Sequence, residues 1–137
     1  MIKGFSHVSI VVPDLDAAIA RVAKLFDLSA GQPMRNEAQG VRIAYVELGN
    51  ARIELMEPSR PDSPVAKFLE RNPNGGVHHF CLNVDDVART AAGLTGNGAR
   101  VLGDGREQHN VHGQRIAFVH PSDFLGALVE LEEQRSH

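Results

Sequence analysis

Two histidines and two glutamates in this chain occur in a pattern that could bind a divalent metal ion. His7 begins the apolar stretch HVSIVV, and His79 begins HFCLNV 72 residues later. Glu54 lies in RIELMEP and Glu130 in ALVELEE, each with apolar residues on both sides. Imidazole nitrogen and carboxylate oxygen together suit ions of intermediate softness, such as Co²⁺, Mn²⁺, Ni²⁺, Fe²⁺ and Zn²⁺. Four such ligands would leave open positions on a six-coordinate ion for substrate oxygens.

An internal repeat relates these four residues to one another. Taken singly, each would be an ordinary strand residue, either hydrogen-bonded or facing water. However, RIAYV at 42–46 recurs as RIAFV at 115–119, and Ile53-Glu54-Leu55 recurs as Val129-Glu130-Leu131. The offset grows along the chain from 72 at the histidines to 73 and then 76. Three matches in the same order indicate duplication, so His7 predicts His79 and Glu54 predicts Glu130.

The elements that must position these residues follow the same plan in both copies, βαβββ. The first copy predicts a strand over HVSIVV, a helix capped by Asp14, and strands at about 41–48 and 51–57 around a tight Gly49-Asn50 turn. Apolar residues fall on one face of its helix at Leu15, Ala18, Ile19, Val22, Leu25 and Phe26. The second copy predicts a strand over HFCLNV, a helix at about 86–96 carrying Val87, Ala91 and Leu94, a short strand near 99–102, and strands near 115–120 and 127–132.

Length and spacing predict a single domain that covers residues 1–137. We place module one at about 4–58, a connecting helix at about 63–72 and module two at about 76–133. The connecting helix is defined by Ser63 as its cap, Pro64 in its first turn and Asn74-Gly75-Gly76 as its terminator.

Composition narrows the class of partner to a small molecule. The formal net charge is −3 and no basic run occurs, which excludes nucleic acid and anionic membrane as expected partners. No apolar stretch is long enough to span a bilayer, and the N-terminus lacks a signal-peptide pattern. The single cysteine, Cys81, cannot form an internal disulfide and is expected to be a buried strand thiol. We therefore expect a cytoplasmic protein.

The remaining histidines are expected to be structural. His78 adjoins His79 and should face the opposite side of the strand, so only His79 should reach the metal. Three histidines lack repeat partners and are expected in loops or at the terminus: His109, His112 and His137. Of these, His112 could line the site, whereas His120 shapes a loop. No phosphate-binding loop, dinucleotide fingerprint or nucleophile elbow occurs in the sequence.

The paired modules, with ligands on their first and last strands, resemble the vicinal oxygen chelate superfamily. Within it, the chain is similar to the methylmalonyl-CoA epimerases almost from end to end, through SHVSIVVPDLDAAI, QGVRIAYVELGNARIELMEP, DSPVAKFLERNPNGGVHHFCLNVDDV and VHGQRIAFVHPSDFLGALVELE. The DSPVAKFL helix followed by GGVHH is the most specific part. The resemblance implies an α+β fold whose two modules form an incomplete eight-stranded barrel-like sheet around a metal site, with His7, Glu54, His79 and Glu130 as ligands. It also implies a homodimer and an acyl-CoA substrate, and we expect Co²⁺ ahead of Mn²⁺, Ni²⁺, Zn²⁺ and Fe²⁺.

The reaction that the resemblance implies is epimerisation of (2R)- and (2S)-methylmalonyl-CoA. It would proceed by removal of the C2 proton and a metal-stabilised enolate, with a proton returned to the opposite face. Proton transfer on two faces needs two bases, for which Glu54 and Glu130 are our candidates. Some relatives have a glutamate where this chain has Ile43, and Glu47 stays open as the second base. Four residues are predicted to bind substrate: Lys67, Arg71, His112 and Arg115.

The chain departs from those epimerases at two further positions. Ser6 stands where they usually have an aspartate before the first histidine, and Ser122 stands where they commonly have a lysine. Two other functions stay open, namely a glyoxalase-I-type isomerase of glutathione hemithioacetals and a non-catalytic protein that sequesters a ligand. The four-ligand set argues against sequestration, which needs no such set of metal ligands.

Overall fold

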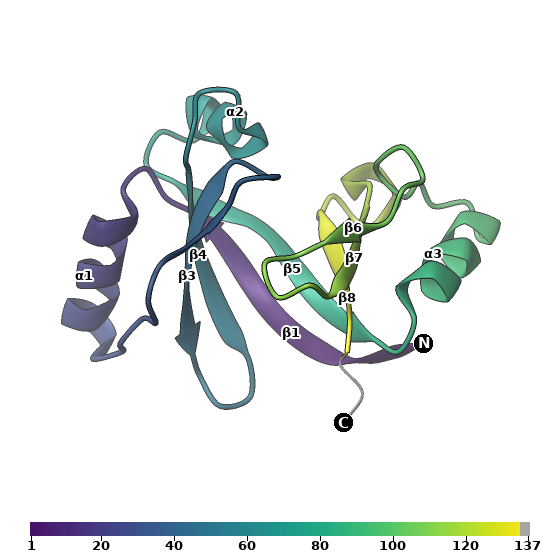
Figure 1. Ribbon diagram of the computed structural model, residues 1–137, viewed down its shortest axis with the longest axis horizontal. Coiled ribbons are helices and arrows are strands. Elements are labelled where there is room, and N and C mark those ends of the chain that lie inside the picture. Colours follow the sequence, from purple (N-terminus) through teal and green to yellow (C-terminus); the bar gives the residue numbers. More distant parts are fainter. Residues whose placement is uncertain (135–137) are drawn as a thin grey trace. The chain divides into compact units, whose positions relative to one another are not determined.

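The computed structural model describes residues 1–134 and contains the predicted βαβββ order twice, with a helix between the two copies (Figure 1). Module one comprises β1 (Ile2–Val11), α1 (Leu15–Phe26), β2 (Met34–Asn36), β3 (Val41–Glu47) and β4 (Arg52–Pro58). The connecting helix is α2 (Pro64–Arg71). Module two comprises β5 (Gly76–Val84), α3 (Val87–Gly96), β6 (Gln108–His109), β7 (Arg115–Val119), a 3₁₀ turn η1 (Pro121–Asp123) and β8 (Val129–Glu133). The predicted α+β class is confirmed.

The chain forms two compact units, and their limits fall within strands β1 and β5. One unit consists of residues 8–78, and the other of residues 1–7 together with 79–137, of which 135–137 lie outside the described part. In the 8–78 unit the strand order is β2-β3-β4-β1. In the other unit the order is β1-β5-β8-β7-β6. The units therefore differ from the sequence modules, because the first residues of β1 belong with the strands of module two.

Each unit contains the same hydrogen bonds at the start of its helix. Asp14 accepts a hydrogen bond from the amide three residues later at 3.0 Å, and Asp86 does the same at 2.9 Å. The first amide of α1 donates to the Glu57 carboxylate of β4 at 2.8 Å, and the first amide of α3 donates to Glu133 of β8 at 3.2 Å. These carboxylates satisfy amides that a helix leaves unpaired at its start. The duplication inferred from sequence thus extends to hydrogen bonds.

Removal of the aspartate cap should destabilise either helix by a similar amount. Asp14→Ala should lower the free energy of unfolding by about 1 kcal/mol, because one amide loses its acceptor. Asp86→Ala should do the same. Asp14→Asn keeps an oxygen acceptor and should stay close to the parent protein. Urea denaturation of the three variants measures the effect, and equal stability of Asp14→Ala and Asp14→Asn would contradict it.

The two cores are also copies of one another. In the 8–78 unit the buried residues Leu15, Ala44, Val46 and Leu55 pack together, and α1 lies against β3 and β4 (Figure 1). Their counterparts in the other unit, Val87, Ala117, Val119 and Leu131, form the second core, where α3 lies against β7 and β8. A single arrangement of side chains at helical and strand spacing therefore serves both units.

Two local predictions were wrong. The strand expected near 99–102 is reduced to one bridge between Val101 and Val119, because the chain turns at Gly103 and Gly105 with φ of 109° and 87°. Its place in the module is taken by β6, which pairs with β7. On α1, Leu25 and Phe26 are 54% and 69% exposed, since the core packed against this helix ends at Val22.

The connecting helix begins where predicted, but its cap differs. The Ser63 hydroxyl makes no cap bond and instead donates to the carbonyl oxygen of Gln39 at 3.4 Å. After the helix, Gly75 has φ of +88°, and a Cβ there would lie 2.5 Å from the Val11 carbonyl oxygen. The predicted terminator therefore needs glycine at this position. Within residues 1–134 no helix has the length and apolarity required to cross a membrane.

Candidate metal centre

His79 and Glu130 are brought together by strand register. β5 and β8 are parallel, and Cys81 is paired with Glu130. Paired residues point to the same face of a sheet, as do residues two apart on one strand, so Glu130 shares a face with His79. His7 lies on the neighbouring strand β1. These three side chains are buried within one unit, with exposures of 1% for His7, 5% for His79 and 5% for Glu130.

Both imidazoles direct Nε2 at the same carboxylate oxygen. His79 Nε2 is 3.0 Å and His7 Nε2 is 3.3 Å from Glu130 Oε2. Ligands at right angles around an ion, with bonds of about 2.1 Å, are separated by about 3 Å. The donor types suit a divalent transition ion. These three residues therefore fit a metal ion of the predicted kind.

The environment of Glu130 keeps its carboxylate ionised. Burial alone would raise its pKa, but hydrogen bonds from His7 and His79, with their positive charge, outweigh burial and lower the pKa to about 2. A carboxylate that stays ionised is a good metal ligand. It is also a weak proton acceptor, so the low pKa favours the ligand role of Glu130 over its role as a base.

Glu54 lies in the other unit, on β4, and is 7% exposed. The hydroxyl of Ser9 donates a hydrogen bond to Glu54 Oε1. The residue pattern left two interpretations of this glutamate, and its burial favours an inward side chain over one that faces water. Its role as fourth ligand stays a prediction. Glu47, the other candidate base, is exposed at the end of β3.

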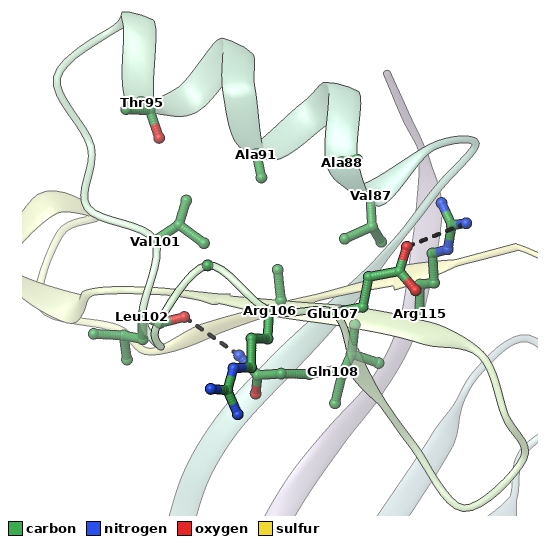
Figure 2. Close-up of a pocket in the computed structure, with 13 residues that line it drawn as sticks. Val87, Ala88, Ala91, Thr95, Val101, Leu102, Arg106, Glu107, Gln108 and Arg115 are labelled. Atoms are coloured by element: carbon green, nitrogen blue, oxygen red, sulfur yellow. Dashed lines mark hydrogen bonds and ion pairs between the residues drawn. The ribbon is translucent and has the colours of Figure 1, made fainter.

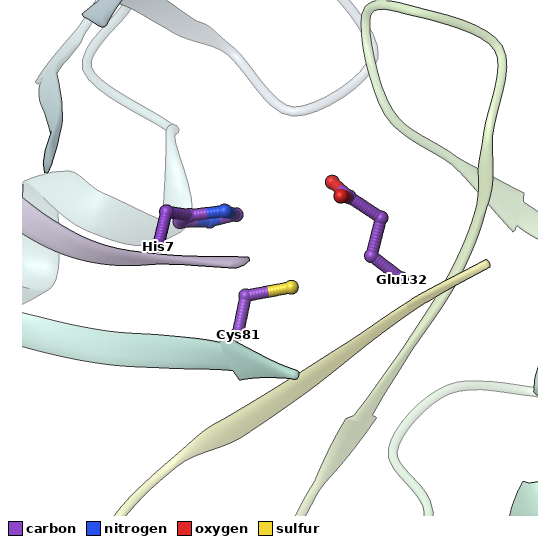
Figure 3. A group of neighbouring side chains, drawn as sticks. All are labelled: His7, Cys81 and Glu132. Carbon is purple, nitrogen blue, oxygen red and sulfur yellow. The ribbon is translucent and has the colours of Figure 1, made fainter. Parts of the chain in front are cut away.

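The sequence prediction missed Glu132, which is 3% exposed. Its carboxylate lies near His7 and Cys81, and potential ligand atoms of the three residues are all within 4.8 Å of one another (Figure 3). Glu132 follows Glu130 by two residues, so strand alternation could have placed it on the same face. The repeat concealed it, because the matching position in module one is Met56. As predicted, Cys81 is a fully buried thiol.

The four predicted substrate-binding residues are divided between the units. Lys67 and Arg71 are exposed on α2, one helical turn apart. His112 lies in the loop before β7, where its amide donates to the Asn110 side chain at 3.0 Å. Arg115 begins β7 and pairs with Glu107 at 3.2 Å. Their contact with substrate stays a prediction.

A cavity of about 400 Å³ lies in the same unit as His7 and His79, between α3 and the segment from Val101 to Gln108 (Figure 2). Apolar residues such as Val87, Ala91 and Ile116 line it. The Glu107–Arg115 ion pair closes part of its wall. Arg115 is the predicted site residue found there, and His7, His79 and Glu130 do not contribute to the lining.

His78 and His120 match their structural interpretation. The ring of His78 packs edge-on against Phe68 with 5.2 Å between ring centroids. His120 accepts a hydrogen bond at Nδ1 from the Ser122 amide at 3.1 Å, which shapes the loop as expected. His109 was expected in a loop but lies on strand β6, with its ring 3.7 Å from the Glu107 carboxylate at the protein surface. His137 is outside the described residues.

Fold and site together are typical of a class of proteins in which two βαβββ modules carry histidine and glutamate side chains on their strands. The chain belongs to the glyoxalase/bleomycin resistance protein/dioxygenase superfamily, whose family model matches residues 6–118.

Several proteins similar over almost the whole chain are named epimerases. The ethylmalonyl-CoA/methylmalonyl-CoA epimerase of Cereibacter sphaeroides is 44% identical over 97% of this chain and 99% of its own length. The mitochondrial methylmalonyl-CoA epimerase of Bos taurus is 38% identical over 93% of this chain and 73% of its own. A single-residue variant of the Streptomyces coelicolor methylmalonyl-CoA epimerase, solved with 2-nitronate-propionyl-CoA, is 34% identical over 99% of this chain and all of its own, with a TM-score of 0.90. The resemblance drawn from sequence motifs is confirmed.

Proposed function

We propose that this protein is a metal-dependent isomerase that interconverts (2R)- and (2S)-methylmalonyl-CoA. The observation that carries the proposal is the buried group of His7, His79 and Glu130, which lies in a chain similar from end to end to methylmalonyl-CoA epimerases. Methylmalonyl-CoA is itself the bound molecule in one solved epimerase of the same fold, with a TM-score of 0.89 and 34% identity.

His7, His79 and Glu130 would hold a divalent ion, with Glu54 as the fourth ligand. Such an ion supplies positive charge beside the thioester and carboxylate oxygens of the substrate, where negative charge develops as the C2 proton leaves. Because His7, His79 and Glu130 are buried, the effective dielectric constant around them is lower than in water, which strengthens the electrostatic effect. We retain Co²⁺ as the first expectation for the ion.

Epimerisation requires a proton acceptor on each face of C2. We assign Glu54 to one face and Glu130 to the other. Glu130, held ionised with a pKa of about 2, would act more weakly as a base in the metal-free site. Lys67, Arg71, His112 and Arg115 are our proposed contacts for the CoA portion, and we expect a cytoplasmic homodimer.

Deuterium incorporation at C2 tests the proposal. Protein loaded with Co²⁺ and incubated in D₂O with (2R)-methylmalonyl-CoA should give deuterium at C2 together with loss of configuration, which NMR and chiral analysis measure. Ethylmalonyl-CoA should be assayed in parallel, since the Cereibacter relative is named for both substrates. A loaded protein that gives no C2 exchange, while it isomerises a glutathione hemithioacetal, would contradict the epimerase proposal and favour the glyoxalase alternative.

A further inference from the structure

The ring nitrogen of His7 that faces away from Glu130 is joined to a second buried carboxylate through a serine. Ser6 Oγ is 3.0 Å from His7 Nδ1 and 3.1 Å from Glu132 Oε1. The exposures of Ser6, His7 and Glu132 are 7%, 1% and 3%. These residues lie in a single unit. They therefore form a buried chain of hydrogen bonds from Nδ1 through a hydroxyl to a carboxylate.

The chemistry of the three groups determines which group donates in each of these hydrogen bonds. An ionised carboxylate only accepts hydrogen bonds, and a serine hydroxyl has one proton to donate. The Ser6 proton therefore goes to Glu132, and Ser6 Oγ must accept from His7 Nδ1–H. Since Nδ1 carries a proton, a neutral His7 has its lone pair on Nε2. This is the nitrogen that faces Glu130.

Asn110 holds Glu132 in place from the other side. The Asn110 amide nitrogen donates to Glu132 Oε2 at 3.0 Å. The orientation of the Asn110 side chain is itself fixed, because its oxygen accepts hydrogen bonds from the backbone amides of His112 and Gln114, both at 3.0 Å. Both oxygens of Glu132 thus face donors, as an ionised carboxylate requires.

We propose that Ser6 and Glu132 are positioning residues that keep a proton on His7 Nδ1 and present the Nε2 lone pair to a divalent cation. The inference rests on the ligand role given to His7 in the proposed function. Metal-binding histidines generally use their second nitrogen to donate to an outer partner, which sets the tautomer and the ring orientation. Here the outer partner is a serine backed by a carboxylate.

The same cluster is poorly suited to bind a metal ion by itself. His7 Nδ1 and Glu132 Oε1 are already bridged by the Ser6 hydroxyl. The Cys81 thiol beside them contacts the Leu82 carbonyl oxygen as a donor at 3.8 Å (Figure 3). The repeat gives Ser6 and Glu132 no equivalent pair, because the residues aligned with them in the other copies are His78 and Met56. Glu132 therefore acts on the first histidine only.

Glu132→Gln should reverse the direction of the hydrogen bonds that link Glu132, Ser6 and His7. The fixed Asn110 donor requires the glutamine oxygen on its own side, which turns the glutamine NH₂ toward Ser6. The Ser6 proton then loses its acceptor unless it turns toward His7 Nδ1. If the Ser6 hydroxyl finds no acceptor, a buried donor is left unsatisfied. If it turns toward His7 Nδ1, the His7 proton must move to Nε2. Either result disfavours metal binding through Nε2.

A double-mutant cycle on metal affinity tests the proposal. Dissociation constants for Co²⁺ and Zn²⁺ are measured by chelator competition for the parent, Ser6→Ala, Glu132→Gln and the double variant. Glu132→Gln should weaken binding by about 10- to 100-fold. In the Ser6→Ala background the same change should alter affinity by no more than about twofold, since no hydroxyl is left to reorient. Ser6→Thr keeps the hydroxyl and should restore binding.

Two controls separate this effect from loss of charge or of a buried serine. Glu133→Gln removes a charge from the next residue of β8, on the face toward α3, and should leave affinity unchanged. Ser63→Ala removes another buried serine hydroxyl and should also leave it unchanged. As a direct readout, the zinc-loaded protein labelled with ¹⁵N-histidine should show a hydrogen-bonded His7 Nδ1 proton that shifts in Ser6→Ala.

If Glu132→Gln weakened metal binding equally in the parent and in the Ser6→Ala background, the proposal would be overturned, because the effect would then come from loss of negative charge alone. Parent protein that binds neither metal would also overturn it. If the cycle behaves as expected but methylmalonyl-CoA shows no C2 exchange, the proposed function fails while the positioning role of Ser6 and Glu132 stands.

Discussion

Glu130→Ala should remove both metal binding and C2 proton exchange. Glu130 Oε2 is the point on which His7 and His79 converge, at 3.3 and 3.0 Å. Its loss would leave two buried imidazoles without their anionic partner. The metal affinity should fall by more than the 10- to 100-fold that is typical of an outer-sphere partner, and kcat by at least about 100-fold. Metal titration and deuterium incorporation measure the two effects separately.

The matched control for Glu130→Ala is Glu133→Ala, three residues along the same strand. Glu133 faces α3 and bonds its first amide. Its removal should lower the free energy of unfolding but leave metal affinity and exchange intact. If Glu130→Ala retained both metal and exchange, the role assigned to Glu130 would be wrong.

Glu54→Gln should separate metal binding from proton transfer. The amide oxygen of glutamine can still act as a ligand, so metal affinity should change little. An amide is not a useful base, and epimerisation should fall by about 10²- to 10⁴-fold. With one base left, Glu130 can still take and return a proton on its own face. In D₂O, one epimer of methylmalonyl-CoA should therefore exchange C2 hydrogen with retention of configuration.

The control for Glu54→Gln is the same substitution at Glu57, whose carboxylate bonds the first amide of α1. Glu57→Gln should epimerise at close to the parent rate once differences in stability are allowed for. Epimerisation by Glu54→Gln at the parent rate would show that another group, such as Glu47, serves as the second base.

The part of the site that could be predicted is the part that the duplication repeats. The match of His7 with His79 and of Glu54 with Glu130 was visible because one copy predicted the other, and the structure buries all four. The same holds for the helix caps and the cores, where periodicity and duplication agreed.

The features that were missed are those in which the copies differ. Glu132 has Met56 as its counterpart, and Ser6 has His78, so alignment of the two copies gave no signal for either residue. The strand expected near Val101 depended on β propensity, which tertiary context overrides, and two glycines with positive φ end it. Exposure of Leu25 and Phe26 could not be inferred from helical periodicity, because periodicity gives the face but not how far the core extends along it.

The glutamates that bond the first helix amides also constrain strand register. Glu57 follows Glu54 by three residues, and Glu133 follows Glu130 by three, so in each module one strand carries an inward carboxylate and a helix contact on its other face. A shift of β8 by one residue would turn Glu130 out of the site, since side chains alternate. The same shift would separate Glu133 from α3. Each helix thus opposes slippage of the strand that bears the predicted ligand, and the donor atoms are held by contacts on the far side of the sheet.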